Sequence, residues 1–196
     1  TLLSLVSGSY FAQNTSFVKD KSAYMPGEQV VFRTDLPAKN IEIRYYHKDR
    51  LLQKQKLENT SWMWTPPKAD YHGYLIALWD TERNQPLATT AVDVSSDWAR
   101  FPRYGFLSKY PDMSAEEQQE IIENLKDHHI NGIQFYDWHY RHDQPLAGTP
   151  EAPWNHWADI GTRIISGKTV ARYIDLAHKY RMNAMFYNLN YGALRG

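Results

Sequence analysis

The stretch FYDWHYRH, Phe135 to His142, directly follows an apolar run, and a related stretch, FYNLNY, recurs from Phe186 to Tyr191. In both, a Phe-Tyr pair precedes a carboxylate or amide side chain, and further aromatic rings follow. An earlier segment, RYGFLSKY from Arg103 to Tyr110, has the same strand-like composition. We interpret the three segments as successive β-strands that each end in a polar position.

Two amphipathic segments separate these strands. Ser114, with Glu117 three residues later, has the pattern of a capping box and predicts the start of the first helix. Asn131-Gly132 is expected to end that helix, and the second helix is predicted over Thr169 to Arg181. Strand, helix, strand, helix, strand is the order of a parallel sheet. The apolar stripes expected to face the sheet are Ile121, Ile122, Leu125 and His129, and then Val170, Tyr173, Ile174 and Ala177.

Each predicted strand pairs an aromatic residue with a polar residue two positions later, so that both point to one face. Parallel α/β folds bind their ligands at the carboxyl ends of the strands. The sequence therefore predicts a binding cleft at this edge of the sheet, although any strand that ends in water also tends to carry a polar residue there. The three triplets are Phe106-Leu107-Ser108, Phe135-Tyr136-Asp137 and Phe186-Tyr187-Asn188.

The chain before Trp98 has a different pattern, with short alternating segments between turn residues and no helix signal. Seven strands are expected, which is the count of an immunoglobulin-like sandwich. We therefore predict two domains: an immunoglobulin-like β-sandwich over 1–97 and the first part of a (β/α)₈ barrel over 98–196, incomplete because a barrel needs about 250 residues. The predicted strands are 29–36, 40–48, 51–58, 71–80 and 86–94, with one more near Phe17 and one near Trp62.

Composition excludes several classes of function. The chain has 22 basic and 22 acidic residues, so no net field favours nucleic acid as a partner. It has no cysteine, which excludes a disulfide framework and a thiolate metal site. The apolar opening, Thr1 to Ala12, is far shorter than the ~20 residues of a membrane span. The absence of cysteine suits an exported bacterial protein, and we expect it to be secreted, periplasmic or on the cell surface.

A group of histidines and carboxylates raises the question of a metal site, because such side chains are zinc ligands in hydrolases. They lie in a loop with Pro145 and Gly148 rather than on a His-Glu-x-x-His helix. We favour polar loop residues or sugar-binding groups, and we predict neither a metal nor another cofactor. The residues concerned are Asp137, His139, His142, Asp143, His156 and Asp159.

The residues around the predicted cleft suit carbohydrate, because sugars offer hydroxyls to polar side chains and apolar ring faces to aromatic ones. Trp154 and Trp157 belong to the same pattern, but they could equally pack the long loop onto the sheet. Asp137 could instead be a loop or helix cap. A glycosidase needs two carboxyl groups, and only Asp137 is well placed at a strand end. The candidate substrate-binding residues are Asp137, Trp138, His139, Tyr140, Asn188, Asn190 and Tyr191.

Two long stretches, Asn131 to Leu146 and Thr169 to Ala193, resemble glycoside hydrolase family 66. Asp20 to Phe32 resembles the start of that family's immunoglobulin-like domain, and Val94 to Tyr110 resembles its junction with the barrel. The family contains endo-dextranases and cycloisomaltooligosaccharide glucanotransferases.

The resemblance implies a retaining, endo-acting enzyme on α-1,6-glucan, whose catalytic Asp and Glu lie on later barrel strands. This chain then holds no catalytic residue, and Asp137 becomes a substrate-binding residue. Two other functions stay open: a cyclising glucanotransferase, and a non-catalytic carbohydrate-binding surface protein.

Overall fold

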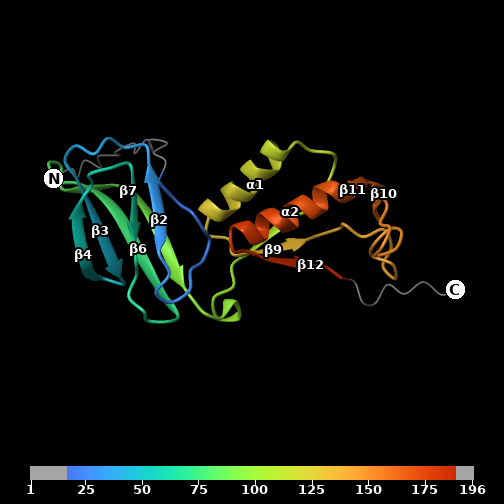
Figure 1. Ribbon diagram of the computed structural model, residues 1–196, viewed down its shortest axis with the longest axis horizontal. Helices are drawn as coiled ribbons and strands as arrows, with labels where there is room; N and C mark the ends of the chain where they lie inside the picture. The colour runs from blue at the N-terminus through green and yellow to red at the C-terminus, as the bar shows by residue number, and fades with distance from the viewer. Residues whose placement is uncertain (1–16, 189–196) are drawn as a thin grey trace, which may run out of the picture.

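The computed structural model describes residues 17–188, and its elements form an antiparallel β group followed by an α/β group (Figure 1). All seven strands expected in the first group are present, and no helix lies among them. They form a three-stranded sheet, β1-β2-β5, and a four-stranded sheet, β4-β3-β6-β7, each antiparallel throughout. The strands are β1 Phe17–Lys19, β2 Val30–Thr34, β3 Ile41–His47, β4 Arg50–Lys56, β5 Ser61–Trp64, β6 His72–Asp80 and β7 Gln85–Val94.

The two antiparallel sheets share one hydrophobic core. Alternate residues of β3, Ile41, Ile43 and Tyr45, are buried, as a half-covered strand requires. Tyr45 stacks on Trp64 of the opposite sheet with ring centroids 4.5 Å apart. The period-two pattern of the sequence therefore translates directly into a sandwich of two sheets.

The second group is built on a parallel sheet. Its strand order is β12-β9-β8, so the three strands lie in the sheet in the order in which they occur along the chain. Both helices lie on one face of this sheet (Figure 1), where Ile122, Tyr173 and Ala177 are buried against it. The parallel arrangement predicted from the sequence is confirmed. The elements are η1 Trp98–Arg100, β8 Tyr104–Leu107, α1 Ala115–Asp127, β9 Gly132–Phe135, β10 His156–Ala158, β11 Ile164–Ser166, α2 Gly167–Lys179 and β12 Asn183–Phe186.

The predicted ends of the helices are wrong. Helix α1 ends at Asp127, and Gly132 is the first residue of β9 rather than a helix terminator. The helix is terminated by His129, which lies two residues after Asp127 and has a φ of 63°. The amide of His129 donates to Lys126 O, and the amide of Ile130 donates to Leu125 O. This is a Schellman motif with histidine at the position that glycine usually occupies.

Helix α2 ends in the same way, with Arg181 at φ 60° and the amide of Met182 bonded to Ala177 O. Its start also differs from the prediction, because the helix begins at Gly167, two residues before Thr169. On α1, Ile121 is exposed, and the buried stripe is Gln118, Ile122 and Lys126. Polar side chains thus occupy two of the three buried positions, which the apolar pattern could not indicate.

Both helix C-termini face the antiparallel group and are bonded to it. Lys19 Nζ donates to Lys126 O at 3.5 Å, and Lys126 Nζ donates to Lys19 O at 2.8 Å. Ser22 donates from its amide and its hydroxyl to Tyr180 O, at 3.1 and 3.0 Å. Because carbonyl groups at a helix C-terminus lack partners inside the helix, these bonds tie the two groups of elements together.

The start of α1 agrees with the sequence and offers a test. Ser114 Oγ accepts from the amide of Glu117 at 3.1 Å, and Glu117 Oε2 accepts from the amide of Ser114 at 2.9 Å. We expect Ser114→Ala to lower the free energy of unfolding by about 1 kcal/mol, because an amide at the helix start loses its acceptor. Urea unfolding followed by circular dichroism measures this change. Ser114→Asp keeps an acceptor and is expected to stay near the original value, so an equal loss for both variants would contradict the capping assignment.

Candidate binding site at the carboxyl edge of the parallel sheet

The carboxyl ends of β8, β9 and β12 lie side by side, and the register of the sheet decides which side chains share a face. Phe135 pairs with Leu107 on one side and with Phe186 on the other. Phe106 pairs with Gln134 instead, so it faces the opposite side and is 62% exposed. The triplet that begins at Phe106 is therefore one residue out of step, and the predicted threefold repeat holds on two strands only.

The repeated Phe-Tyr pair has a simple structural basis. Phe135 is buried against the helices, and Tyr136, the next residue, points to the face that the helices leave uncovered. Tyr136 and Tyr187 lie beside each other with ring centroids 4.6 Å apart. The structure thus adds two aromatic rings to the candidate site, which the sequence analysis did not include among the substrate-binding residues. Alternation along the strand was the signal for them.

Asp137 follows β9 by two residues and lies in an unusual backbone conformation, with φ 50°. This left-handed region is tolerated by aspartate and asparagine better than by most residues. The carboxylate is partly exposed, and its Oδ2 pairs with Arg163 Nη2 at 3.1 Å. Asp137 therefore sits at the strand end, as predicted, but with a cationic partner that the sequence did not indicate.

Arg163 comes from a hairpin that the sequence prediction treated as a plain loop. Strands β10 and β11 pair antiparallel, and the turn between them carries Asp159 and Arg163. Arg163 Nε binds Asp159 Oδ2 at 2.7 Å, and the Asp159 carboxylate is fully buried. This hydrogen bond and the nearby charge of Asp137 raise the pKa of Arg163 above its usual value, so the guanidinium remains cationic.

Tyr110 fixes the backbone under the site. Its hydroxyl is within hydrogen-bonding distance of Leu107 O and of Tyr136 O, at the ends of two adjacent strands. Burial raises the pKa of Tyr110, so the hydroxyl stays protonated and available as a donor. The strand ends that carry the candidate residues are thereby held at a fixed separation.

Trp138 and His139 are predicted site residues that the structure buries, with 8% and 0% of their surface exposed. Neither ring nitrogen of His139 has a hydrogen-bond partner within residues 17–188, and the same holds for Nε1 of Trp138. His139 packs against Trp138 and Tyr187. Their role as substrate-binding residues stays a prediction.

Trp154 and Trp157 of the long loop were considered above either as sugar-binding residues or as residues that pack the loop onto the sheet, and the structure separates them. Trp157 is 5% exposed and donates from Nε1 to Trp138 O at 2.9 Å, which is a packing role. Trp154 is 51% exposed, and Tyr140 packs against it with centroids 5.4 Å apart. Trp138, Trp154 and Trp157 also line an apolar pocket of about 580 Å³ next to α2.

The remaining predicted residues lie at the end of the described chain. Asn188 is exposed directly after β12 and Tyr187. Asn190 and Tyr191 fall outside the described residues, so their roles stay predictions.

The histidines and carboxylates considered above as metal ligands do not cluster in the part of the chain that the structure describes. His156 pairs with Asp112 at 2.9 Å, and among residues 17–188 no three His, Cys, Asp or Glu side chains gather as a metal site.

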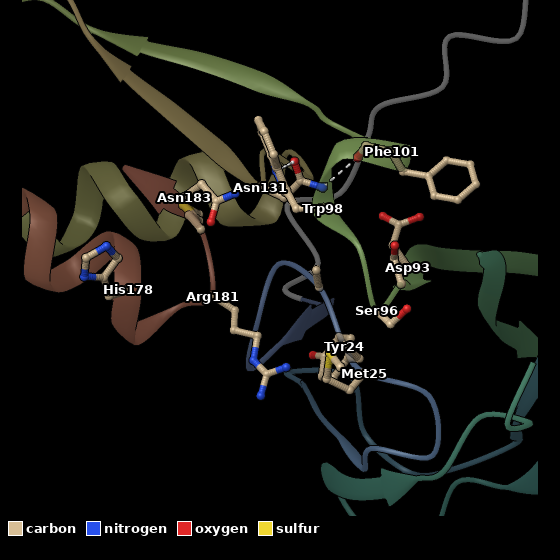
Figure 2. A pocket seen from close by; sticks show the side chains of 13 residues that line it. Tyr24, Met25, Asp93, Ser96, Trp98, Phe101, Asn131, His178, Arg181 and Asn183 are labelled. Atoms are coloured by element: carbon tan, nitrogen blue, oxygen red, sulfur yellow. Dashed lines mark hydrogen bonds between the residues drawn. The ribbon is translucent and has the colours of Figure 1, made fainter. Parts of the chain in front are cut away.

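A second pocket, of about 300 Å³, lies where the two groups of elements meet (Figure 2). At its centre, Asn131 accepts from Trp98 Nε1 and from the Arg103 amide, both at 2.8 Å, and donates to Phe101 O at 2.9 Å. Both the oxygen and the nitrogen of this amide side chain are thus bonded within the protein. The pocket lies at the amino ends of β9 and β12, whereas parallel α/β folds bind their ligands at the carboxyl ends of the strands. We therefore place the candidate site at the opposite edge, around Asp137.

One further observation concerns membranes. Over residues 17–188, none of the helices combines the length and the apolar composition needed to cross a bilayer.

Comparison with known proteins gives a family match and several similar proteins. The model of glycosyl hydrolase family 66 matches residues 19–196. A cycloisomaltooligosaccharide glucanotransferase of Niallia circulans is 31% identical over 192 residues, which cover 89% of this chain and 20% of that protein. A dextranase of Streptococcus salivarius is 25% identical over 130 residues, covering 60% of this chain and 16% of that protein.

A solved structure is also similar. The cycloisomaltooligosaccharide glucanotransferase of Paenibacillus sp., complexed with cycloisomaltoheptaose, superposes with a TM-score of 0.74 at 33% identity. The match covers 88% of this chain and 27% of that one. This chain thus spans about a fifth to a quarter of the length of the glucanotransferases that it matches.

Proposed function

The chain belongs to glycosyl hydrolase family 66, and from that premise we propose that the full-length protein is a retaining, endo-acting hydrolase of α-1,6-glucan such as dextran. Among its relatives are a dextranase and cycloisomaltooligosaccharide glucanotransferases. The observation that carries the proposal is the cluster of Asp137, Tyr136 and Tyr187 at the carboxyl edge of the parallel sheet. It combines a carboxylate for sugar hydroxyls with aromatic faces for the ring carbons.

The architecture proposed for the whole protein is an immunoglobulin-like sandwich over 1–97, followed by a (β/α)₈ barrel that begins at 98. Seven antiparallel strands in two sheets support the first part. Sequential strand order with both helices on one face supports the second, because a doubly wound sheet would carry helices on both faces. Tyr104 and Phe106, 53% and 62% exposed on the face without helices, are apolar surface that further barrel strands would cover.

We assign the chemistry to an Asp nucleophile and a Glu acid/base on later barrel strands. Two carboxyl groups about 5–5.5 Å apart would give retention through a covalent glycosyl-enzyme. Within this chain, Asp159 is buried and bound to Arg163, so it cannot reach a sugar. Asp137 is partly exposed, and its role in the proposed mechanism is to hold the substrate while carboxylates elsewhere break the bond.

Cyclising transfer is the second candidate reaction. It is favoured by the higher identity and wider coverage of the matched glucanotransferases, 31% over 89% of the chain against 25% over 60% for the dextranase. Both reactions share the glycosyl-enzyme and differ in whether water or a sugar hydroxyl attacks it. Chromatography of the products from dextran separates the two reactions, since hydrolysis gives linear isomaltooligosaccharides and transfer gives cyclic ones.

We also propose that the protein is exported to the cell surface, the periplasm or the medium. Fractionation of the producing cells tests this proposal.

The isolated 196-residue chain is expected to release no reducing sugar from dextran, because the proposed nucleophile and acid lie beyond it. The measurement is a reducing-sugar assay with the full-length protein as positive control. Hydrolysis by the isolated chain would return Asp137 to the role of nucleophile. A full-length protein that binds dextran without cleaving it would instead leave the non-catalytic carbohydrate-binding function.

A further inference from the structure

Arg163 connects the loop hairpin to the ends of two barrel strands. Its Nη1 donates to Ser108 O at 3.3 Å, just after β8, and its Nη2 lies 3.5 Å from Asp137 O, just after β9. The same Nη2 donates to Asp137 Oδ2 at 3.1 Å. One guanidinium thus touches both strand ends and the carboxylate that we place in the binding site.

Arg163 is itself held in place by Asp159. Asp159 Oδ2 accepts from Arg163 Nε at 2.7 Å, and Oδ1 accepts from the amides of Gly161 and Arg163, both at 2.8 Å. The buried carboxylate therefore fixes both the turn and the side chain that emerges from it. A planar guanidinium bound at Nε by one carboxylate has little freedom left to present its Nη atoms.

The same hairpin also fixes the backbone of Trp138, the residue after Asp137. Trp157 of β10 donates from Nε1 to Trp138 O at 2.9 Å, so the hairpin holds the chain on both sides of the Asp137–Trp138 peptide. Asp137 Oδ2 is occupied by Arg163, whereas no hydrogen bond to Oδ1 occurs within residues 17–188. The carboxylate therefore has one oxygen fixed by the protein and one left for a ligand.

We infer that Arg163, held by Asp159, is a positioning residue that orients the Asp137 carboxylate so that Oδ1 accepts a hydroxyl of the bound α-1,6-glucan. The inference rests on the proposed function, since it assumes that Asp137 binds the sugar. Lysine would keep the charge at 163 but cannot bind Asp159 and Asp137 at once in a fixed plane. The orientation of Asp137, rather than its presence, is what such a substitution removes.

The test is a double-mutant cycle in the full-length enzyme, with kcat and KM on dextran measured for each variant. We expect Arg163→Lys and Asp159→Asn each to lower kcat/KM about tenfold per folded molecule. Arg163→Lys should keep a melting temperature close to that of the unmodified enzyme, whereas Asp159→Asn should also lower it, because the buried carboxylate accepts from Arg163 and from two backbone amides. In the Asp137→Asn background, Arg163→Lys is expected to cause less than a twofold further loss, because its effect passes through Asp137. Arg172→Lys on α2 is the matched control, since Arg172 forms no ion pair among residues 17–188.

The outcomes separate the inference from the proposed function. A tenfold loss that persists in the Asp137→Asn background shows that Arg163 acts independently of Asp137 and overturns the inference. Full activity of Arg163→Lys, with Asp137→Asn impaired, also overturns it and leaves the proposed function intact. Full activity of Asp137→Asn itself removes the substrate-binding role on which the inference rests. If Arg163→Lys folds poorly, Asp159→Asn supplies the same comparison from the other end of the interaction.

Discussion

Replacing Asp137 by asparagine in the full-length enzyme is expected to lower kcat/KM on dextran about 10²-fold, or ~2.7 kcal/mol. A hydrogen bond to a charged acceptor contributes about 1.5–3 kcal/mol, and its strengthening in the transition state adds to the loss. Asparagine keeps the shape of the side chain and tolerates the φ of 50° at this position. The melting temperature should therefore change little, because the ion pair with Arg163 is partly exposed and contributes little stability.

Two further variants make this result interpretable. Asp143→Asn, a matched substitution of an exposed aspartate in the same loop, is expected to leave kcat/KM unchanged. Asp137→Ala is expected to lose as much activity as asparagine and about 1 kcal/mol of stability in addition, because alanine is strained at positive φ. If Asp137→Asn instead melts early while each folded molecule keeps normal activity, Asp137 is a structural cap and not a ligand for sugar.

The sequence predicted the order and type of the elements well because those depend on local patterns. Alternation gave the seven antiparallel strands, and helical spacing gave α1 and α2. The helix ends were mispredicted because His129 and Arg181 adopt the left-handed conformation that the rule reserves for glycine. Both lie where the antiparallel group contacts the helices, so tertiary contacts support a conformation that local propensity disfavours.

The site was predicted less completely because it depends on contacts between distant segments. Asp137 could be placed from its position after a strand, whereas nothing local links it to Arg163, which lies 26 residues later. The hairpin that carries Arg163 consists of two three-residue strands, too short for an alternation signal. The sheet register that puts Phe106 out of step and brings Tyr136 beside Tyr187 is likewise set by pairing between strands.

Acidification from pH 6.5 to 4 is expected to destabilise the protein by about 2 kcal/mol through His129, at the contact between α1 and the antiparallel group. Lys19 Nζ lies 3.1 Å from His129 Nδ1, and because an ammonium group only donates, that nitrogen must be an unprotonated acceptor. Burial, followed by the charge of Lys19, lowers the pKa of His129 from 6.5 to about 4. Burial also lowers the pKa of Lys19 to about 8, so Lys19 is already cationic throughout this range.

The direction of the effect follows from proton binding. Between pH 6.5 and 4 the unfolded chain takes up a proton at His129 and the folded chain does not, so stability falls as the pH falls. The full difference in pKa corresponds to at most about 3.4 kcal/mol, at 1.36 kcal/mol per pH unit, and partial exposure of the ring reduces it. The charge of Asp93 raises the pKa of His129, and the charges of Arg103 and His128 lower it, so these three groups also contribute to the size of the effect.

The measurement is urea unfolding at intervals from pH 4 to 8 for the unmodified protein and for His129→Gln. Glutamine can still accept a hydrogen bond from Lys19 but does not titrate, so the difference between the two curves isolates His129. We expect this difference to grow as the pH falls below 6.5, and to grow more slowly as the pH approaches 4, the pKa of His129 in the folded protein. Parallel curves for the unmodified protein and His129→Gln would mean that the histidine protonates without disturbing the contact with Lys19, and the contact would then contribute nothing to acid sensitivity.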